Sequence, residues 1–364
     1  MTDEYYMQLA LRLARRGTRR VSPNPMVGAV IVKDDRIIGA GYHQRFGGPH
    51  AEIMALHNAK APVMGATLYV TLEPCSHFGK TPPCVEALIE AGPARVVIGI
   101  SDPNPLVAGR GIAALRSAGI ETVVGVCEEA CREINEKFIK FITTGRPYVT
   151  LKYAQTIDGR IASAIGQSRW VSSPASRTFA HRLRSTHDAI LVGIGTVLQD
   201  DPELTVRHVK GRNPVRIIVD SHLRIPLSAK VLREQEKART IIAHTRRADP
   251  KKIKPLQDKG VETLLVGENG DQRVNLKELL SALGRKQLAS LLVEGGSSVI
   301  TSLLKDKLVD RLAIIVAPKI LGQGIEAVAD LGNKSMDEAI KLNLRKVYRL
   351  GGDIVIDARP ANSA

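Results

Sequence analysis

The first part of the chain alternates short runs of β-forming residues with helical patterns. Residues 27–32 (VGAVIV) and 36–42 (RIIGAGY) are apolar runs, and a Lys-Asp-Asp turn joins them as in a hairpin. Further runs and helical patterns then alternate, with strands expected at 66–74, 94–100 and 121–126 and helices at 51–59, 84–92 and 113–120. Strands that alternate with helices predict an α/β domain with a mixed sheet.

A Gly-Arg-Pro break at residues 145–147 separates this pattern from a second α/β alternation. Beyond it we expect strands within 148–155, 188–198, 214–221, 239–245, 261–267, 290–296, 310–318 and 351–359, with helices at 276–284 and 298–308. We therefore predict two domains, residues 1–145 and 146–364.

The length and composition agree with two ordinary globular domains. The chain has 364 residues, of which 44% are hydrophobic and 24% charged, and one core rarely serves so long a chain. No segment approaches the roughly 20 apolar residues of a membrane helix. The first residues show helical spacing of Tyr6, Leu9 and Leu13 rather than the apolar block of a secretion signal. We expect a cytoplasmic protein with no membrane partner.

The net charge suggests nucleic acid as a partner, but the distribution of the basic residues and the low aromatic content disfavour it. A formal charge of +15 and a pI near 9.8 attract phosphate. However, the basic residues are spread along the chain, and aromatic residues make up only 4%, too few for an obvious base-stacking platform. We expect a basic enzyme that handles anionic small molecules.

The stretch from His50 to Cys84 carries the strongest chemical signal. His50, Cys75 and Cys84 offer one imidazole and two thiolates, the ligand set of a zinc site that keeps its fourth position for water. Glu52, two residues after the histidine, is left free to move protons. H-x-E followed by P-C and a second cysteine is the signature of zinc deaminases that act on cytosine-like and adenine-like rings. A closed site with His77 as a fourth ligand is the structural alternative.

The other two cysteines, Cys127 and Cys131, lie four residues apart in a helical pattern. No histidine accompanies them, so we expect half-buried helix cysteines rather than a second metal site. Four cysteines in a chain of this length do not indicate a disulfide scaffold.

The spacing of the two ligand cysteines narrows the substrate. Nucleobase and tRNA deaminases of this class usually have P-C-x-x-C, whereas eight residues, SHFGKTPP, separate Cys75 from Cys84 here. This insertion contains Lys80, a cation that could meet a substrate phosphate.

HAE, TLEPCSHFGKTPPC, PNPMVGAVIV and DPNPLVAGRG together closely resemble the deaminase half of a bifunctional riboflavin-biosynthesis family. Its members combine diaminohydroxyphosphoribosylaminopyrimidine deaminase with 5-amino-6-(5-phosphoribosylamino)uracil reductase. The resemblance implies a cytidine-deaminase-like three-layer domain. It also implies that the pyrimidine and the ribose phosphate are held by Asn24, His43, Lys80, Asp102 and Asn104. For each of these residues a purely structural role in a loop is the alternative, because asparagine also suits turns.

The second half lacks the G-x-G-x-x-G fingerprint of dinucleotide folds, but LLVEGGSSVITSLL places a glycine pair between a strand and a helix start. Such a turn can present backbone N–H groups to phosphate. TLKYAQTIDGRIA, SRWVSS, LVGIGTVLQDDPELTVR and VAPKILG resemble the reductase half of the same family, which is similar to dihydrofolate reductase. The resemblance therefore covers nearly the whole chain.

The reductase resemblance implies two sets of residues. NADPH would be bound by Ala154, Trp170, Ser172, Thr196, Asp200, Ser221, Gly295, Gly296, Ser297 and Ser298. The substrate would be faced by Lys152, Ser168, Arg184, Leu204, Arg207 and Glu294. Arg184 and Arg207 suit a phosphate because guanidinium groups bind it through two hydrogen bonds. Lys152 and Asp200 are both open as proton donors, as is water, and Trp170 could instead be a core anchor.

We therefore predict a zinc deaminase and an NADPH-dependent reductase that act in succession on one phosphoribosylaminopyrimidine, in a homo-oligomer. One alternative is a deaminase of RNA or free nucleobases with an accessory nucleic-acid-binding domain. Another is a zinc-stabilised RNA-binding protein without enzymatic activity, which would make Glu52 incidental.

Overall fold

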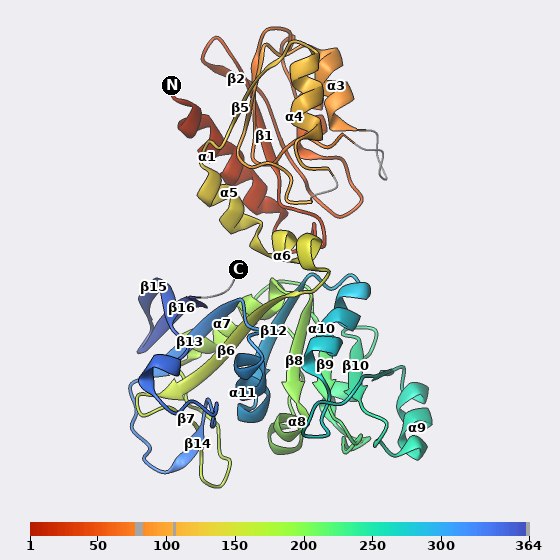
Figure 1. Cartoon of the computed structure of the whole chain (residues 1–364), viewed down its shortest axis with the longest axis vertical. Coiled ribbons are helices and arrows are strands. Elements are labelled where there is room, and N and C mark those ends of the chain that lie inside the picture. The colour runs from red at the N-terminus through yellow and green to blue at the C-terminus, as the bar shows by residue number, and fades with distance from the viewer. Residues whose placement is uncertain (77–82, 105–106, 362–364) are drawn as a thin grey trace. The chain divides into compact units, whose positions relative to one another are not determined.

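The computed structural model describes residues 1–76, 83–104 and 107–361 (Figure 1). The chain divides into two compact units, Met1–Gly145 and Arg146–Ala364. The last helix of the first unit, α6 (Glu136–Thr144), ends at Gly145, whose φ of 67° is left-handed. Glycine adopts this conformation without the steric cost that other residues meet, so it ends the helix at this residue.

The first unit is built on a five-stranded mixed sheet with the order β2-β1-β3-β4-β5. The second strand in this order, β1 (Gly28–Lys33), runs antiparallel to both of its neighbours, β2 (Arg36–Tyr42) and β3 (Thr67–Val70). Two further strands, β4 (Arg95–Ile98) and β5 (Glu121–Val124), continue in parallel. The predicted mixed sheet is confirmed.

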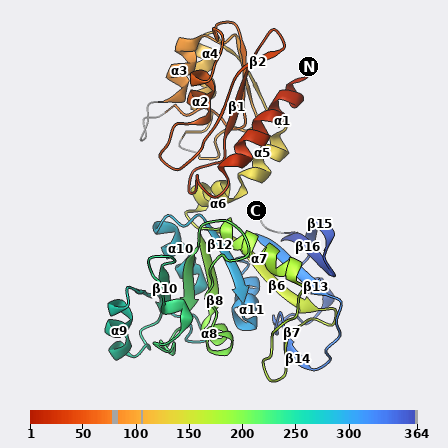
Figure 2. The same cartoon turned by 180° about the vertical axis from the view of Figure 1, so that it is seen from behind.

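Helices cover both faces of this sheet, which makes three layers. They are α1 (Asp3–Ala14), α2 (Ala51–His57), α3 (Cys84–Ala91), α4 (Arg110–Ser117) and α5 (Glu128–Ile134), with α6 following. Figures 1 and 2 show α3 and α4 on one side of the sheet and α1 and α5 on the other.

The packing of α1 on the sheet follows from its sequence. The Thr2 hydroxyl accepts a hydrogen bond from the Tyr5 N–H at the helix start, a favourable cap. One apolar face is buried, and a Cβ on Gly28 of β1 would lie 2.0 Å from the Ala10 carbonyl oxygen. Only glycine at position 28 lets the helix approach the strand this closely.

The second unit contains a nine-stranded sheet with the order β11-β10-β9-β8-β12-β6-β13-β16-β15. All neighbours from β11 to β13 are parallel, while β16 and β15 form an antiparallel hairpin at one edge. The bounds are β6 (Tyr148–Thr156), β8 (Ala189–Gly193), β9 (Val215–Val219), β10 (Thr240–His244), β11 (Glu262–Leu265), β12 (Ser290–Gly295), β13 (Arg311–Ala317), β15 (Leu342–Leu350) and β16 (Asp353–Pro360). A separate pair joins β7 (Arg160–Ser163) to β14 (Gly324–Glu326).

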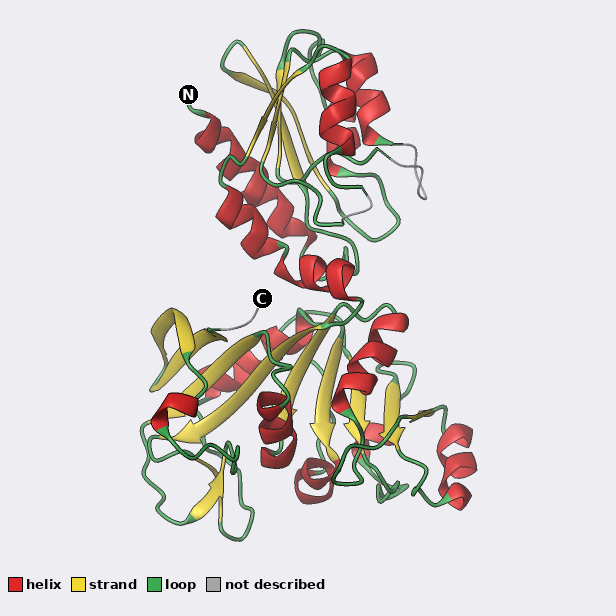
Figure 3. Cartoon of the chain, in the orientation of Figure 1, coloured by secondary structure: helices red, strands yellow, loops and turns green. Residues whose placement is uncertain are grey.

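Helices pack on both faces of the large sheet (Figure 3). They are α7 (Pro174–Ser185), α8 (Ile194–Asp200), α9 (Ile253–Asp258), α10 (Leu276–Arg285) and α11 (Ser297–Lys305). Successive strand residues point to opposite faces. Leu191 and Leu291 therefore join the core formed with α10 and α11, whereas their neighbours Ile190 and Leu292 join the core formed with α7 and α9.

The structure differs from the sequence prediction in several places. The strand expected within 188–198 ends at Gly193, where α8 begins, and the helix α7 was not predicted. The strand expected at 66–74 ends at Val70, so Thr71, Leu72 and Glu73 belong to the segment that leads to Cys75. The strand β15 was not predicted, because its residues are exposed on both faces and show no apolar alternation. Across the described residues, no helix combines the length and the hydropathy that a membrane span requires.

Candidate active sites

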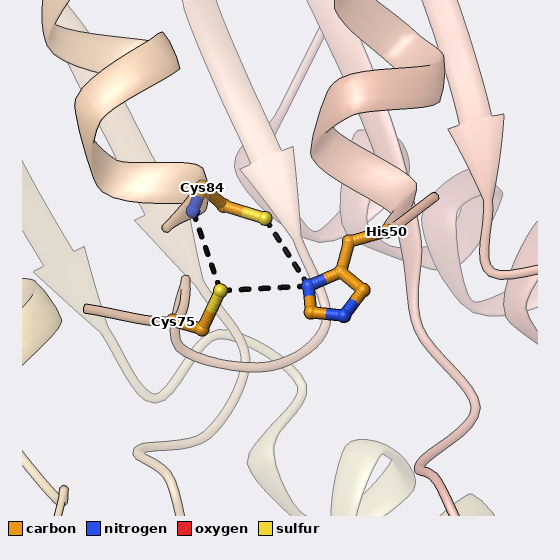
Figure 4. A group of neighbouring side chains, drawn as sticks. All are labelled: His50, Cys75 and Cys84. Atoms are coloured by element: carbon orange, nitrogen blue, oxygen red, sulfur yellow. Dashed lines mark hydrogen bonds between the residues drawn. The ribbon is translucent and has the colours of Figure 1, made fainter. Parts of the chain in front are cut away.

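The three predicted zinc ligands meet in the first unit (Figure 4). His50 is the residue directly before α2, and Cys84 begins α3. The His50 Nδ1 lies 3.2 Å from the Cys84 Sγ and 3.4 Å from the Cys75 Sγ. Zinc bonds of about 2.0 Å to nitrogen and about 2.3 Å to sulfur at a tetrahedral angle put these atoms about 3.5 Å apart. The donor set therefore fits zinc.

Hydrogen bonds within this group favour a thiolate on Cys75. The Cys84 side chain, the His50 ring and the Cys84 backbone N–H, which is 3.3 Å from the Cys75 Sγ, lower the pKa of Cys75 to about 4. The same contact with Cys75, together with burial, raises the pKa of Cys84. Contact with the Cys75 thiolate raises the pKa of His50. Cys75 and Cys84 thus share one proton, which a bound cation would displace.

Glu52 lies beside these ligands and is 3% exposed. Burial raises the pKa of its carboxyl group to about 7, although the nearby His50 opposes the shift. A group that titrates near neutral pH can both accept and release a proton. Glu52 thus has the environment that a general acid and base requires.

A cavity of about 310 Å³ opens onto Glu52, His50 and Cys75. Four of the predicted substrate residues line it, namely Asn24, His43, Asp102 and Asn104. The structure brings them together from loops that are far apart in sequence.

His43 and Asn24 hold each other in place. The His43 Nδ1 is 3.0 Å from the Pro49 carbonyl oxygen, so it carries the proton, and the Nε2 accepts from the Asn24 amide at 3.1 Å. The His43 ring stands edge-on to the His50 ring, 5.5 Å between centroids. Burial lowers the pKa of His43, so its ring is neutral at pH 7.

Sequence reasoning missed Glu73, a buried residue that lines the same cavity. It was read as part of a strand, and only its place directly before Pro74 and Cys75 could have drawn attention to it. Lys80 and the alternative ligand His77 lie outside the described residues.

The second unit contains two adjoining cavities at the carboxyl ends of its parallel strands, the usual ligand side of such sheets. They measure about 640 and 340 Å³ and share Ser168, Thr196, Asp200 and Gly296. Their other lining residues include Lys152, Ala154, Trp170, Ser172, Arg184, Arg207, Ser221, Glu294, Gly295, Ser297 and Ser298.

Leu204 is the predicted reductase residue that lines neither cavity. Its side chain is 2% exposed and packs in the core with Ile190 and Ile218. Its φ of 56° shows that the chain turns sharply here. If Leu204 meets a ligand, it must do so through its backbone.

Arg184 is paired with a carboxylate, which changes its interpretation. Its Nε and one terminal nitrogen donate to the Glu294 carboxylate at 2.7 and 2.8 Å, and the other terminal nitrogen donates to the Thr205 carbonyl at 3.0 Å. Both side chains are almost buried. Three of the five guanidinium donors are thus used within the protein, including the two that face Glu294 side by side.

The buried ion pair sets the charges around it. Burial opposes ionisation of Glu294, but Arg184 outweighs it and lowers the Glu294 pKa to about 2. Burial lowers the pKa of Lys152, while the charge of Glu294 partly restores it. Asp200 accepts a hydrogen bond from the Ser168 hydroxyl at 3.0 Å. Lys152 thus lines this pocket from β6, close to the charge of Glu294.

Trp170 is 62% exposed and lies at the cavity rim, so the alternative of a core anchor is wrong. The Arg177 guanidinium carbon stands 4.3 Å from its ring centroid. A cation over an indole face is attracted by the ring quadrupole. The ring is thereby held where a flat ligand could pack against it.

The glycine turn predicted to face phosphate is present between β12 and α11. Gly295 has a φ of 121°, which residues with a Cβ rarely adopt. Gly195 of α8 lines the larger cavity as well, and a Cβ there would meet no atom within 4 Å. The backbone N–H groups at the start of α11 border the larger cavity. An elongated pocket with open glycines and a helix start fits a pyrophosphate-linked cofactor such as NADPH.

Three residues at the far end of the larger cavity, His222, Arg224 and Arg273, were not singled out from the sequence. Within residues 1–76, 83–104 and 107–361, neither arginine has an ion-pair or hydrogen-bond partner for its guanidinium. The Val274 N–H donates to the Ser221 hydroxyl at 3.1 Å, which ties the two loops that carry these arginines. No sequence motif links such distant positions.

Two family models match the chain. One, described as "RibD C-terminal domain", matches residues 147–356. The other, described as "Cytidine and deoxycytidylate deaminase zinc-binding region", matches residues 1–100. Together they cover both units.

Curated relatives match nearly from end to end. The riboflavin biosynthesis protein RibD of Aquifex aeolicus is 49% identical over 97% of each chain. That of Escherichia coli K12 is 42% identical over 98% of this chain and 99% of the relative.

Solved structures agree with the sequence relatives. Acinetobacter baumannii RibD has a TM-score of 0.89 at 40% identity over 99% of both chains. A diaminohydroxyphosphoribosylaminopyrimidine deaminase/5-amino-6-(5-phosphoribosylamino)uracil reductase of Thermotoga maritima has a TM-score of 0.86 at 39% identity, with the same coverage.

These matches confirm the predicted fold class, a cytidine-deaminase-like domain followed by a dihydrofolate-reductase-like domain. They also confirm the predicted activities and the cofactors zinc and NADPH. The chain belongs to the RibD family, the bifunctional deaminases and reductases of riboflavin biosynthesis.

Proposed function

We propose that residues 1–145 deaminate the diaminopyrimidine phosphoriboside and that residues 146–364 reduce the ribosyl chain of the product. The observation that carries the first assignment is the position of Glu52, buried beside His50, Cys75 and Cys84 in one cavity. For the second it is the pairing of Glu294 with Arg184 beside Lys152 in the pocket below the glycine turn.

In deamination, His50, Cys75 and Cys84 would hold zinc, which would supply a nucleophilic water at neutral pH. Glu52 accepts the two protons of that water in turn, and passes the first to the ring nitrogen and the second to the departing amine. His43, neutral and fixed by Pro49, presents its edge to the pyrimidine together with Asn24. We place Asp102 and Asn104 on the opposite wall as further substrate contacts.

In reduction, NADPH would supply the hydride for C1 of the open-chain ribose imine. Opening of the sugar ring moves the N–H proton to the ring oxygen, so the nitrogen needs a proton when hydride adds to C1, and we assign this proton to the buried Lys152. The charge of Glu294 favours the ammonium form of Lys152, and Arg184 orients Glu294. We therefore assign Arg184 a positioning role and leave Arg207 to the substrate phosphate.

The cofactor would extend through both cavities. Trp170, Ala154 and Ser172 lie at the nicotinamide end, and Thr196 and the turn Gly295 to Ser298 receive the pyrophosphate. Asp200 would act by fixing Ser168. The larger cavity then ends at Ser221, where Arg224 and Arg273 can receive the 2′-phosphate that distinguishes NADPH from NADH.

Self-association is proposed from the edge of the large sheet. Every residue of β15 is exposed or half-buried, and Leu344 and Val347 are 64% and 56% exposed. An edge strand of nine residues with exposed apolar side chains is a possible template for a second chain. A second copy would cover it, and Leu344→Glu would then lower the molar mass measured by light scattering.

The chain is further proposed to act in the cytoplasm without nucleic acid. The two ligand thiols lie within 4.8 Å of the His50 nitrogen and of each other, so an oxidising compartment could pair them and abolish the metal site. The substrate cavity of about 310 Å³ suits one nucleotide-sized molecule rather than a strand.

One experiment tests the succession of reactions. Purified protein is incubated with the diaminopyrimidine phosphoriboside while ammonia is followed, and NADPH is then added while its absorbance is recorded. We expect ammonia first and NADPH oxidation only afterwards. Ammonia without oxidation would remove the reductase assignment, and turnover of RNA instead of the small molecule would favour the nucleic-acid alternative.

A further inference from the structure

Glu73 is a buried carboxylate for which deamination chemistry has no use. It is 5% exposed and follows β3 by three residues, two residues before the ligand Cys75. It borders the same cavity as Glu52. A buried charge is costly unless hydrogen bonds compensate it, so its partners define its role.

The Glu73 carboxylate accepts four backbone hydrogen bonds from a single segment. One oxygen accepts from Asp102 N–H at 2.9 Å and Gly109 N–H at 3.0 Å. The other accepts from Gly111 N–H at 2.9 Å and Ile112 N–H at 3.2 Å. Each carboxylate oxygen has about two lone-pair sites, so these four donors occupy the group. Glu73 is thus committed to the backbone rather than to proton transfer.

Two of these donors belong to the first turn of α4. The residue before that helix is Gly109, which has no side chain to cap the free N–H groups. The Glu73 carboxylate takes the place of the missing cap and puts negative charge at the positive end of the helix. The start of α4 is therefore stabilised from another segment.

A second observation shows that α4 is held tightly against the zinc-ligand segment. A Cβ on Gly111 would lie 2.1 Å from the carbonyl oxygen of Pro74, the residue between Glu73 and Cys75. No larger residue fits there without moving the backbone. The close approach at Pro74 and the hydrogen bonds at Glu73 thus fix the same pair of segments.

The segment held in this way carries two proposed substrate residues. The Asp102 N–H is bound by Glu73, and the Asp102 carboxylate in turn accepts from the Asn104 N–H at 2.8 Å. Glu73 is two residues from Cys75 in the chain. Its hydrogen bonds therefore fix the backbone that carries Asp102 and Asn104 relative to a metal ligand.

We propose that Glu73 is a positioning residue of the deaminase, which sets the distance between the metal site and the substrate contacts Asp102 and Asn104. This inference rests on the proposed roles of Asp102 and Asn104. Its consequence is a substrate-binding defect without loss of metal when the carboxylate is changed.

The test uses the full-length zinc-loaded enzyme with Glu73→Gln. The glutamine has the same shape, but its NH2 group must face two backbone N–H donors. We expect hydrogen exchange at the amides of Asp102, Gly109, Gly111 and Ile112 to accelerate at least about tenfold, since two charge-assisted hydrogen bonds are lost. The KM for the diaminopyrimidine should rise by a similar factor, with zinc content and reductase kcat/KM unchanged.

The matched control is Glu86→Gln, a change of an exposed carboxylate on α3 that should alter neither exchange nor KM. Asp102→Ala and Asn104→Ala are measured beside it. If these two raise KM while Glu73→Gln does not, the positioning role is overturned. If Asp102→Ala and Asn104→Ala leave KM unchanged, the proposed substrate contacts are wrong instead. Faster hydrogen exchange with an unchanged KM in Glu73→Gln also overturns the positioning role.

A variant that merely unfolds would lose zinc and show a changed circular dichroism spectrum. In that event Glu73→Asp is measured in the same assays, because aspartate keeps the charge but is one methylene too short to reach all four donors. Wild-type exchange and KM in Glu73→Asp would then refute the proposal.

Discussion

The two active sites stabilise charge in different ways. In the deaminase site, His50, Cys75 and Cys84 converge, and no cationic side chain among the described residues is bonded to them. In the reductase site, the carboxylate Glu294 is already neutralised by Arg184. The first site is therefore incomplete without its metal, whereas the buried ion pair of the second is already formed before any ligand binds.

Removal of zinc is the strongest way to test this contrast. A chelator should abolish ammonia release, because the metal held by His50, Cys75 and Cys84 is needed to activate the attacking water. NADPH oxidation with pre-deaminated substrate should continue at its original rate. Ammonia release that persists after the metal content falls to zero would contradict the zinc assignment.

Glu52→Gln isolates proton transfer from metal binding. We expect zinc to be retained and kcat for deamination to fall by about 10² to 10⁴, the range typical of general acid and base catalysis. Metal analysis and an ammonia assay measure both. Near-normal turnover would remove Glu52 from the mechanism.

Breaking the internal ion pair should damage the second unit itself. Glu294→Gln leaves Arg184 buried without a countercharge, a loss of about 3 to 5 kcal/mol in the free energy of unfolding, and reduction should fall with it. Denaturant unfolding followed in parallel with NADPH oxidation measures both effects.

The matched control for that variant is Asp258→Asn, which breaks an exposed ion pair with Lys254 on α9. Its expected effect is at most about 1 kcal/mol. Equal losses in the two variants would mean that burial of the Glu294 pair has no special weight.

Substitution of the two arginines at the end of the cofactor cavity, Arg224 and Arg273, should weaken the binding only of ligands that carry a 2′-phosphate. In Arg224→Ala with Arg273→Ala, we expect the Kd of 2′,5′-ADP to rise about tenfold or more, since charge-assisted hydrogen bonds to its phosphate are lost. The Kd of 5′-AMP should not change. Calorimetry measures both ligands. Arg247→Ala, which removes an arginine paired with Glu268, is the control, and a parallel loss for both ligands would reject 2′-phosphate recognition.

The smallest expected effect concerns His181, whose Nδ1 accepts the Arg207 N–H at 3.0 Å. Burial, with Arg184 nearby, lowers its pKa to about 4. The unfolded chain takes up this proton near the ordinary value of about 6.5, so the stability of the fold falls as the pH drops from there toward 4. His181→Asn should reduce the difference in Tm between pH 7 and pH 5 by about 3 °C. An unchanged difference would contradict the assigned proton state.

The sequence predicted the deaminase site better than the reductase site, for a physical reason. Metal ligands must lie at fixed places in the fold, so the residues that do the chemistry remain recognisable as the motifs H-x-E and P-C. Arg184 was assigned to phosphate because its residue type suits one, and only the fold shows that Glu294, 110 positions away, occupies its donors. Cationic residues such as Arg224 and Arg273 likewise become a group only after folding.

The helices and strands could be predicted where an element buries one face or all of its residues. The apolar run of β10 predicted a buried strand correctly, whereas the strand expected within 188–198 was too long, because the same apolar run continues into α8. The edge strand β15 was missed, because a strand with no buried face has no hydrophobic pattern to detect. Glu73 was missed because local sequence cannot show that a carboxylate meets four backbone N–H groups from a segment about thirty residues later.

The two-sided burial of the large sheet also has a consequence for how its strands find their alignment. Adjacent residues such as Ile190 and Leu191 are both apolar, so a slip by one position would still bury every side chain. Hydrophobicity alone therefore leaves the alignment undecided. Polar pairs at the strand starts decide it, since the Asp310 carboxylate accepts the Val149 N–H at 2.8 Å and the Ser290 hydroxyl accepts the Asp188 N–H at 3.0 Å. These bonds exist in one alignment only. A chain that lacked them would form several sheet alignments of nearly equal free energy during folding.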